Sequence, residues 1–162
     1  MNTANMNASP MTPQAIAEAV AVGMMAKDRA TTHLGMRVTH ISPGAAHLEM
    51  TVREDMLNGH DTCHGGYITT LADSAFAFAC NSYNELTVAA SLTIDFIAPV
   101  YGGEVLTARA KEVSLSKRTG VYDVEVLNQK GRCVAVFRGR SHRIQGRSVV
   151  PITAAPDAPA PI

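Results

Sequence analysis

The sequence predicts an α+β protein in which an antiparallel sheet of about five or six strands wraps around one long buried helix. Residues 65–82 are apolar nearly all round, which is typical of a helix covered on every side. Residues 88–96 alternate between apolar and small or polar side chains, the period of a strand. After residue 104, three strand-length segments are joined by short turns, which favours an antiparallel meander.

The first half of the chain predicts one helix and two strands before the buried helix. Thr12-Pro13 supplies a capping hydroxyl and a proline at the first helical position, so a helix should begin there and end near Lys27. Strands are predicted over residues 36–42 and 46–52, on either side of a Pro-Gly turn. The loop 53–63 then leads into the buried helix.

The second half predicts the rest of the sheet. Pro99 and Gly102-Gly103 end the strand 88–96. The three strands of the meander are expected over residues 104–115, 121–127 and 132–144, and their turns over residues 116–120 and 128–131.

These elements define one domain with a tail at each end. Residues 1–11 and the Pro/Ala-rich residues 145–162 show no periodicity, so we expect both to be disordered. The remaining residues, 12–144, are enough for one domain with one core.

Composition excludes several classes of function. The chain has 14 basic and 14 acidic residues, a balance that argues against nucleic-acid binding. Its three cysteines form no CxxC pair, which makes a disulfide framework or a zinc site unexpected. We see no signal peptide and no apolar run long enough to span a membrane, so we expect a cytoplasmic protein without a membrane partner.

The start of the buried helix carries the strongest chemical signal. Gly65 and Gly66 can present backbone N–H groups at the positive end of the helix, and they could equally be a plain helix start. Asp73 is a carboxylate on an otherwise apolar segment. It could be a buried acid satisfied by backbone groups or an arginine, but its sequence neighbours offer no partner. Burial would raise its pKa and make it a stronger base.

The spacing of these two residues predicts a dimer. Asp73 lies eight residues after Gly65, which separates them by about 12 Å along a helix. A base and a carbonyl-binding N–H must both act within about 3 Å of the reacting groups. Two antiparallel copies of the helix can meet this demand, with Gly65 of one subunit facing Asp73 of the other. We therefore predict a two-fold homodimer with two equivalent sites.

The loop before the helix allows alternatives. His60, Asp61, Cys63 and His64 are possible metal ligands, but their spacing outside a helix does not align them, so we predict no metal. Cys63 and His64 are not expected to act as a nucleophile and its base, because adjacent residues seldom reach each other in the required geometry. His64 could instead shape the turn or orient Asn58, or have no role. Asn58 could be an ordinary residue of an Asn-Gly turn.

A substrate pocket should lie near the helix. Met56, Tyr67, Leu71 and Phe76 are candidates for its lining, and simple core packing is the alternative, above all for Leu71 and Phe76.

The order of elements and several motifs resemble the hotdog-fold thioesterases, and within them the PaaI group, named for phenylacetyl-CoA catabolism. The resemblance covers residues 12–144. Its specific parts are Asn58-Gly59-His60, Cys63-His64-Gly65-Gly66, Leu71-Ala72-Asp73, Ala79-Cys80-Asn81-Ser82 and Ser116-Lys117-Arg118-Thr119-Gly120.

This resemblance implies hydrolysis of acyl-CoA thioesters, with phenylacetyl-CoA and hydroxyphenylacetyl-CoA as the group's namesake substrates. It implies homodimers paired into tetramers and no metal or redox cofactor. Asp73 would be the base or nucleophile, the Gly65 N–H would polarise the carbonyl, and Asn58 would position the reactants. Ala77 stands where a neighbouring group has a hydroxyl, so Ser74 or Asn58 would have to hold the water.

The resemblance also implies a CoA contact at Lys117, Arg118, Thr119 and Gly120, where lysine and arginine suit phosphate charge. A solvated hairpin turn is the alternative there. For the whole protein, a non-catalytic acyl-CoA-binding or regulatory module on the same fold is the main alternative. A hotdog dehydratase is disfavoured because its motifs are missing.

Overall fold

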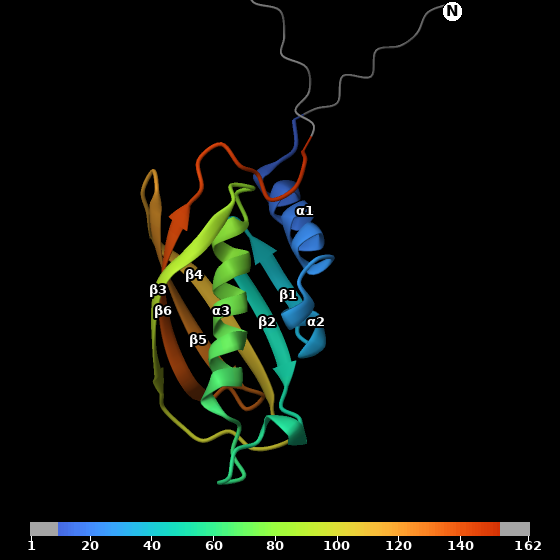
Figure 1. The fold of residues 1–162 in the computed structure, drawn as a ribbon, viewed down its shortest axis with the longest axis vertical. Helices are drawn as coiled ribbons and strands as arrows, with labels where there is room; N and C mark the ends of the chain where they lie inside the picture. Colours follow the sequence, from blue (N-terminus) through green and yellow to red (C-terminus); the bar gives the residue numbers. More distant parts are fainter. Residues whose placement is uncertain (1–9, 153–162) are drawn as a thin grey trace, which may run out of the picture.

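A computed structural model describes residues 10–152 of the chain. Its six strands form one fully antiparallel sheet in the order β1-β2-β4-β5-β6-β3, which confirms the predicted sheet (Figure 1). The strands are β1 (Arg37–Ser42), β2 (Ala45–Thr51), β3 (Thr87–Phe96), β4 (Val105–Leu115), β5 (Thr119–Asn128) and β6 (Cys133–Arg143). The last three are neighbours in sequence order, as the short turns predict.

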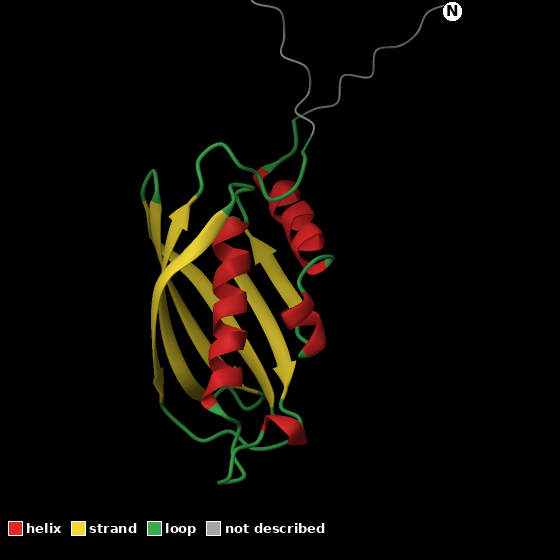
Figure 2. Ribbon diagram, viewed as in Figure 1, coloured by secondary structure: helices red, strands yellow, loops and turns green. Residues whose placement is uncertain are grey.

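The long helix α3 (Gly65–Asn81) lies against the sheet, which curves around it (Figures 1 and 2). Helix α1 (Pro13–Met25) packs on β1 and α3, and a short helix α2 (Arg29–His33) follows it. A 3-10 turn, η1 (Glu54–Met56), precedes the loop that leads into α3. No helix within residues 10–152 is both long and apolar enough to cross a membrane.

The core lies between α3 and the inner face of the sheet. Phe76 is 1% exposed, and its ring centroid lies 5.5 Å from that of Tyr122 and 5.8 Å from that of Phe137. Gly139 of β6 leaves room for this ring, because a Cβ there would lie 2.9 Å from Phe76 Cζ. The buried helix of the sequence analysis is therefore confirmed, and Phe76 anchors it to the sheet.

Helix α1 begins as predicted: Thr12 Oγ1 accepts a hydrogen bond from the Ala15 N–H, and Pro13 is the first helical residue. Helix α2 was not predicted. Asp28 caps it by accepting hydrogen bonds from the N–H and the hydroxyl of Thr31, at 3.0 and 2.6 Å. At five residues, it is too short to show a periodic pattern in the sequence.

Strand β3 is a free edge of the sheet. Within residues 10–152 its backbone pairs only with β6, and most of its residues are exposed in the single chain. Large apolar side chains stand on it, with Val88 46%, Leu92 39% and Phe96 53% exposed. Because an exposed apolar edge strand is a template for pairing with another strand, this edge is a candidate subunit interface.

The ordered chain continues past Ile144, where we predicted the domain to end. The Asn84 side chain accepts hydrogen bonds from the Val149 and Val150 N–H groups and donates one to the Val150 carbonyl. Residues 145–152, predicted as part of the C-terminal tail, are thereby attached to the turn after α3. The remainder of the two predicted tails, residues 1–9 and 153–162, lies outside the described residues.

Candidate active site

The loop before α3 holds the helix start in place through backbone hydrogen bonds. The Cys63 N–H donates to the Val100 carbonyl at 2.7 Å, and the His64 N–H donates to the Met56 carbonyl at 2.8 Å. His64 is the N-cap of α3, and its Nδ1 accepts a hydrogen bond from the Gly66 N–H at 3.0 Å. His64 therefore shapes the helix start, and among the described residues it forms no hydrogen bond with Asn58.

Gly65 is the first residue of α3, and its N–H group donates no hydrogen bond within the described part of the chain. This donor lies at the positive end of the helix, where an oxygen with developing negative charge is stabilised. A Cβ on Gly65 would lie 2.8 Å from Phe96 Cζ, so the ring of Phe96 occupies the space of a side chain. A larger residue here would therefore have to displace the exposed ring of Phe96, and glycine also keeps the N–H accessible.

Asp73 lies two turns further along α3, half-buried. Its Oδ1 is buried and has no hydrogen-bond partner among the described residues. Burial raises the pKa of this carboxyl group above its ordinary value. An unpartnered carboxylate costs stability, so its presence in a well-packed helix is typical of a functional group rather than a structural one.

Asp73 and Gly65 share one flank of α3. Gly65, Thr69, Asp73 and Ala77 follow one another at four-residue spacing and are all less buried than the residues between them that face the sheet. Because Phe96 covers Gly65, this flank faces the β3 side of the molecule, where the sheet edge is open. The eight-residue separation keeps the two groups about 12 Å apart in one chain.

Asn58 lies in the loop and organises its turn. Its Oδ1 accepts hydrogen bonds from the His60 N–H at 2.8 Å, from the Thr62 N–H at 3.4 Å and from the Thr62 hydroxyl at 3.2 Å. Its amide NH2 group makes no hydrogen bond to any described residue. Asn58 can therefore both stabilise the turn and position reactants, because its side-chain oxygen fixes the turn and its NH2 group stays available.

The predicted pocket residues are not brought together. Met56 is 0% and Phe76 1% exposed, so both are core residues of the single chain and neither lines a surface pocket. Helix α3 is apolar nearly all round, and the sequence could not indicate which of its apolar residues faces the sheet. Tyr67 is half-buried and lines a hollow beside the start of α3, together with Leu57 and Thr70.

A second hollow, which the sequence analysis missed, adjoins Gly65. It measures about 420 Å³ and is mainly apolar, with Thr62, Cys63, Gly65, Ile68 and residues 96–100 as its lining. Phe96 and Ile97 are 53% and 58% exposed there. Its apolar lining beside a free N–H suits an acyl group whose carbonyl reaches that donor. The only sequence signal for it is the apolar run of β3 continuing into Ile97 and Ala98.

Cys63 lies at this hollow as a thiol. Burial raises its pKa to about 11, so it is not ionised at neutral pH. Its Sγ contacts the His64 carbonyl and not the His64 ring. This geometry agrees with the rejection of a cysteine nucleophile. Over residues 10–152, no three His, Cys, Asp or Glu side chains lie close enough together to hold a metal ion.

The segment predicted to bind CoA forms the β4–β5 hairpin. Lys117 and Arg118 are exposed at its tip, and Thr119 closes the turn through the Ser116 hydroxyl. Gly120 is buried in β5, where a Cβ would lie 2.7 Å from Tyr122 Cε2, so a side chain has no room at this position. The hairpin lies at the end of the sheet where α3 terminates, opposite the start of α3 (Figure 1).

Comparison with known proteins identifies the family of this chain. The family model of the Thioesterase superfamily matches residues 60–135. The acyl-coenzyme A thioesterase PaaI of Escherichia coli (strain K12) is 48% identical over 123 residues, covering 76% of this chain and 88% of the relative.

Solved structures show the same relationship. The E. coli PaaI protein from the phenylacetic acid degradation operon aligns with a TM-score of 0.82 and 45% identity, covering 84% of this chain and 99% of that chain. A hypothetical thioesterase from Streptococcus pneumoniae TIGR4, solved with coenzyme A, aligns with a TM-score of 0.67 and 26% identity, covering 70% and 91%. The chain therefore belongs to the thioesterase superfamily, as a PaaI-type acyl-CoA thioesterase with the hotdog fold.

Proposed function

We propose that this thioesterase hydrolyses phenylacetyl-CoA or hydroxyphenylacetyl-CoA to the free acid and CoA, at sites shared by the two protomers of a homodimer. The observation that carries the proposal is Asp73, a carboxylate with a buried, unpartnered oxygen on the flank of α3 that faces the open edge of the sheet.

In this proposal, Asp73 either deprotonates the water that attacks the thioester carbon or attacks that carbon itself. In both routes the C–S bond breaks and CoA leaves as its thiolate, and in the second route water then hydrolyses the mixed anhydride to the free acid and the Asp73 carboxylate. The Gly65 N–H of the other protomer stabilises the charge that develops on the thioester oxygen. Asn58 holds the reactants through its free amide group, and His64 acts indirectly by capping α3. The raised pKa of Asp73 supports its role as a base, because a more basic carboxylate accepts a proton more readily.

The dimer forms along β3. Antiparallel pairing of two β3 strands satisfies the open backbone groups of this edge and covers Val88, Leu92 and Phe96. The same two-fold axis sets two copies of α3 antiparallel, so each Asp73 approaches the partner's helix start. We further propose that two dimers pair into a tetramer.

The acyl group occupies the apolar hollow beside Gly65. An aryl-acetyl group suits it because the ring can pack against Phe96 while the carbonyl points to the helix start. The E. coli relative from the phenylacetic acid degradation operon supports this choice of substrate. Lys117 and Arg118 contact CoA, and the CoA-bound streptococcal relative supports CoA as the carrier. The proposed location is the cytoplasm, which the three free cysteines favour.

A thiol-release assay across short, medium, long-chain and aryl-acyl CoA esters tests the substrate. We expect phenylacetyl-CoA or its hydroxylated form to give the highest kcat/KM. A clear preference for long chains would overturn the substrate assignment. Tight binding of every ester without release of thiol would favour a non-catalytic binding module.

A further inference from the structure

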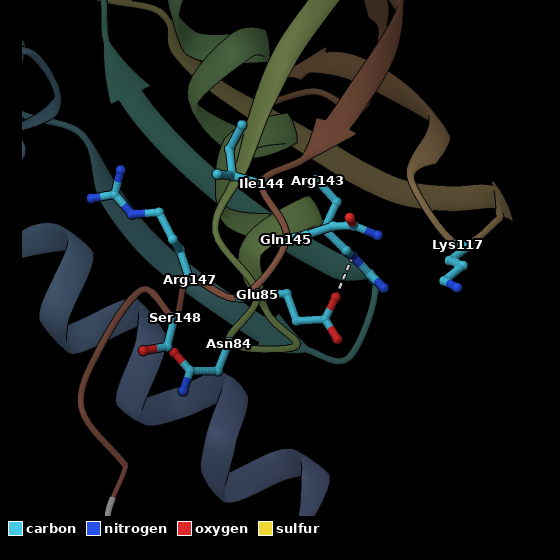
Figure 3. A pocket seen from close by; sticks show the side chains of 9 residues that line it. Asn84, Glu85, Lys117, Arg143, Ile144, Gln145, Arg147 and Ser148 are labelled. Carbon is cyan, nitrogen blue, oxygen red and sulfur yellow. Dashed lines mark ion pairs between the residues drawn. The ribbon is translucent and has the colours of Figure 1, made fainter.

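Two clusters of basic side chains lie away from the hollow beside Gly65. The first lines a hollow of about 510 Å³ where α3 ends, and Arg143 is paired there with Glu85 (Figure 3). Lys117, which is part of the proposed CoA contact, also lines this hollow, so it belongs to the site already described. The second cluster has no role in that site, and it lies on the outer face of the sheet at the edge formed by β1.

The second cluster is a pair of histidines on neighbouring strands. His40 of β1 and His47 of β2 are direct cross-strand partners, because the register of the two strands shifts between Val38 and His40. The shift leaves Thr39 out of the pairing. Without it, His40 would lie opposite Ala46, which is buried in the core. The bulge therefore places both imidazole rings on the outer face of the sheet.

The separation of the two rings suits a shared metal ion. Their centroids lie 4.8 Å apart, and the rings are tilted by 43°. A metal ion about 2.0–2.1 Å from one nitrogen of each ring would lie roughly 3.2 Å from each centroid. The two centroids then subtend an angle of about 97° at the ion. This angle falls between the roughly 90° of square-planar and octahedral sites and the roughly 109° of tetrahedral sites.

Each ring has a nitrogen available to bind an ion. His40 is exposed, and its Nε2 lies 3.2 Å from the Ser42 hydroxyl. With the proton on Nε2, that N–H donates to Ser42 and Nδ1 presents its lone pair, as in metal sites where the second nitrogen of a ligand is held by a partner. The ring of His47 forms no hydrogen bond with any described residue. Burial, His40 and Arg109 lower the pKa of His47, which favours the neutral ring.

The charges around the pair limit how tightly an ion can bind. Arg109 is the cross-strand partner of His47 on β4, and its positive charge opposes a cation. Glu49, two residues after His47 on the same face, is paired with Arg37 at 2.9 Å. Over residues 10–152 no third His, Cys, Asp or Glu side chain completes the site. The remaining coordination positions are therefore open to water, unlike those of a closed structural zinc site.

We propose that His40 and His47 bind a divalent ion of a late first-row transition metal, Zn²⁺ or Cu²⁺, with water in the other coordination positions. Both ions take imidazole nitrogen as a ligand. The ion links β1 to β2 and so holds an edge strand that, within the described residues, pairs with no other strand. This inference is independent of the proposed thioesterase function, because none of its residues belongs to that site.

Calorimetry with zinc chloride tests the pair. The wild-type protein should bind Zn²⁺, and His40→Gln and His47→Gln should each bind it at least about tenfold more weakly, because losing even a residue that supports a metal ligand costs about 10–100-fold. His33→Gln removes a lone exposed histidine from α2, so it is the matched control and should bind Zn²⁺ as the wild type does. Equal affinity in all four proteins, or no binding by the wild type, would overturn the inference.

Thermal unfolding tests whether the ion links the two strands. Zn²⁺ should raise Tm of the wild type and of His33→Gln, and it should leave Tm of His40→Gln and His47→Gln unchanged. Without metal, all four Tm values should agree within roughly 2 °C, because the substituted rings lie on the surface. A rise of the same size in every variant would contradict the assignment.

Two further variants test the surroundings of the ion. Arg109→Gln removes the opposing charge and should tighten Zn²⁺ binding by about two- to fivefold. Ser42→Ala removes the hydroxyl that holds the His40 ring and should weaken binding by about tenfold. Weaker binding by Arg109→Gln, or unchanged binding by Ser42→Ala, would contradict the proposed geometry.

Electron paramagnetic resonance with Cu²⁺ identifies the ligands directly. The wild-type spectrum should show coupling to two imidazole nitrogens, and the spectra of His40→Gln and His47→Gln to one fewer. A wild-type spectrum that neither substitution changes would show that the ion binds elsewhere and would overturn the inference.

Discussion

Replacing Asp73 by asparagine should separate activity from stability. The neutral amide has the same shape but cannot accept the proton of water, and a positioned general base contributes about 10²–10⁴-fold to a rate. We therefore expect kcat for phenylacetyl-CoA to fall by about 10²-fold or more, with CoA binding preserved.

The same substitution should not weaken the fold. Asp73 Oδ1 is buried without a partner, and burial raises the pKa of its carboxyl group, so the ionised form opposes folding at neutral pH. Asparagine removes the charge but leaves a polar group at the same place. The free energy of unfolding should stay the same or rise by up to about 1 kcal/mol, which raises Tm by roughly 2–4 °C for a domain of this size.

Asp123→Asn is the matched control, because the Asp123 carboxylate is paired with an arginine, whereas Asp73 Oδ1 is buried without a partner. It is exposed on the outer face of the sheet, where two hydrogen bonds from Arg138, of 2.6 and 2.7 Å, hold its pKa below the usual range. Its replacement should lower stability by no more than about 1 kcal/mol and leave kcat unchanged. Thiol-release kinetics and thermal unfolding of both variants decide the matter. An Asp73→Asn protein that keeps activity within about tenfold of wild type would exclude Asp73 as the base, and one that unfolds would show that the carboxylate supports the fold.

Three further outcomes are expected. Leu92→Lys places a charge on the open edge of β3, so light scattering should show monomers and the thiol-release assay little activity. Gly120→Ala should lower the free energy of unfolding by about 1–3 kcal/mol, measured by denaturant titration, because the added Cβ would meet Tyr122 and Ser141. In the folded variant, KM for CoA esters should stay unchanged. The kcat/KM of the wild type should fall as pH drops through the raised pKa of Asp73. Over that range the stability gap to Asp73→Asn should shrink, because the folded wild type takes up its proton at a higher pH than the unfolded chain.

Periodicity in the sequence was sufficient to predict most of the fold. Three local signals each predicted an element that the structure contains: the Thr12-Pro13 helix start, the alternation along β3 and the short turns of the meander. Gly65 and Asp73 could be chosen from the sequence. Gly65 offers a backbone N–H at a helix start, and Asp73 is a charged residue in an otherwise apolar helix. The dimer followed from their spacing alone and remains a prediction.

The features that the sequence did not predict depend on contacts between distant segments. Phe76 was a candidate for the pocket lining with core packing as its alternative, and the contacts of its ring with Tyr122 and Phe137 show that it faces the sheet. Gly120 resembled a ligand-binding turn residue, whereas its neighbour across the sheet, Ser141, leaves no room for a side chain. The link between Asn84 and residues 149–150 spans 65 residues, and no local pattern marks it.

We propose that each active site takes Asp73 from one protomer and Gly65 from the other, and mixed dimers test this sharing. Asp73→Asn protein and Gly65→Val protein, each inactive alone, are dissociated together and reassembled. If the residues act across the dimer, each mixed dimer regains one intact site, and random pairing restores about a quarter of wild-type activity. If the mixture stays as inactive as its two components although mixed dimers form, the shared site is contradicted.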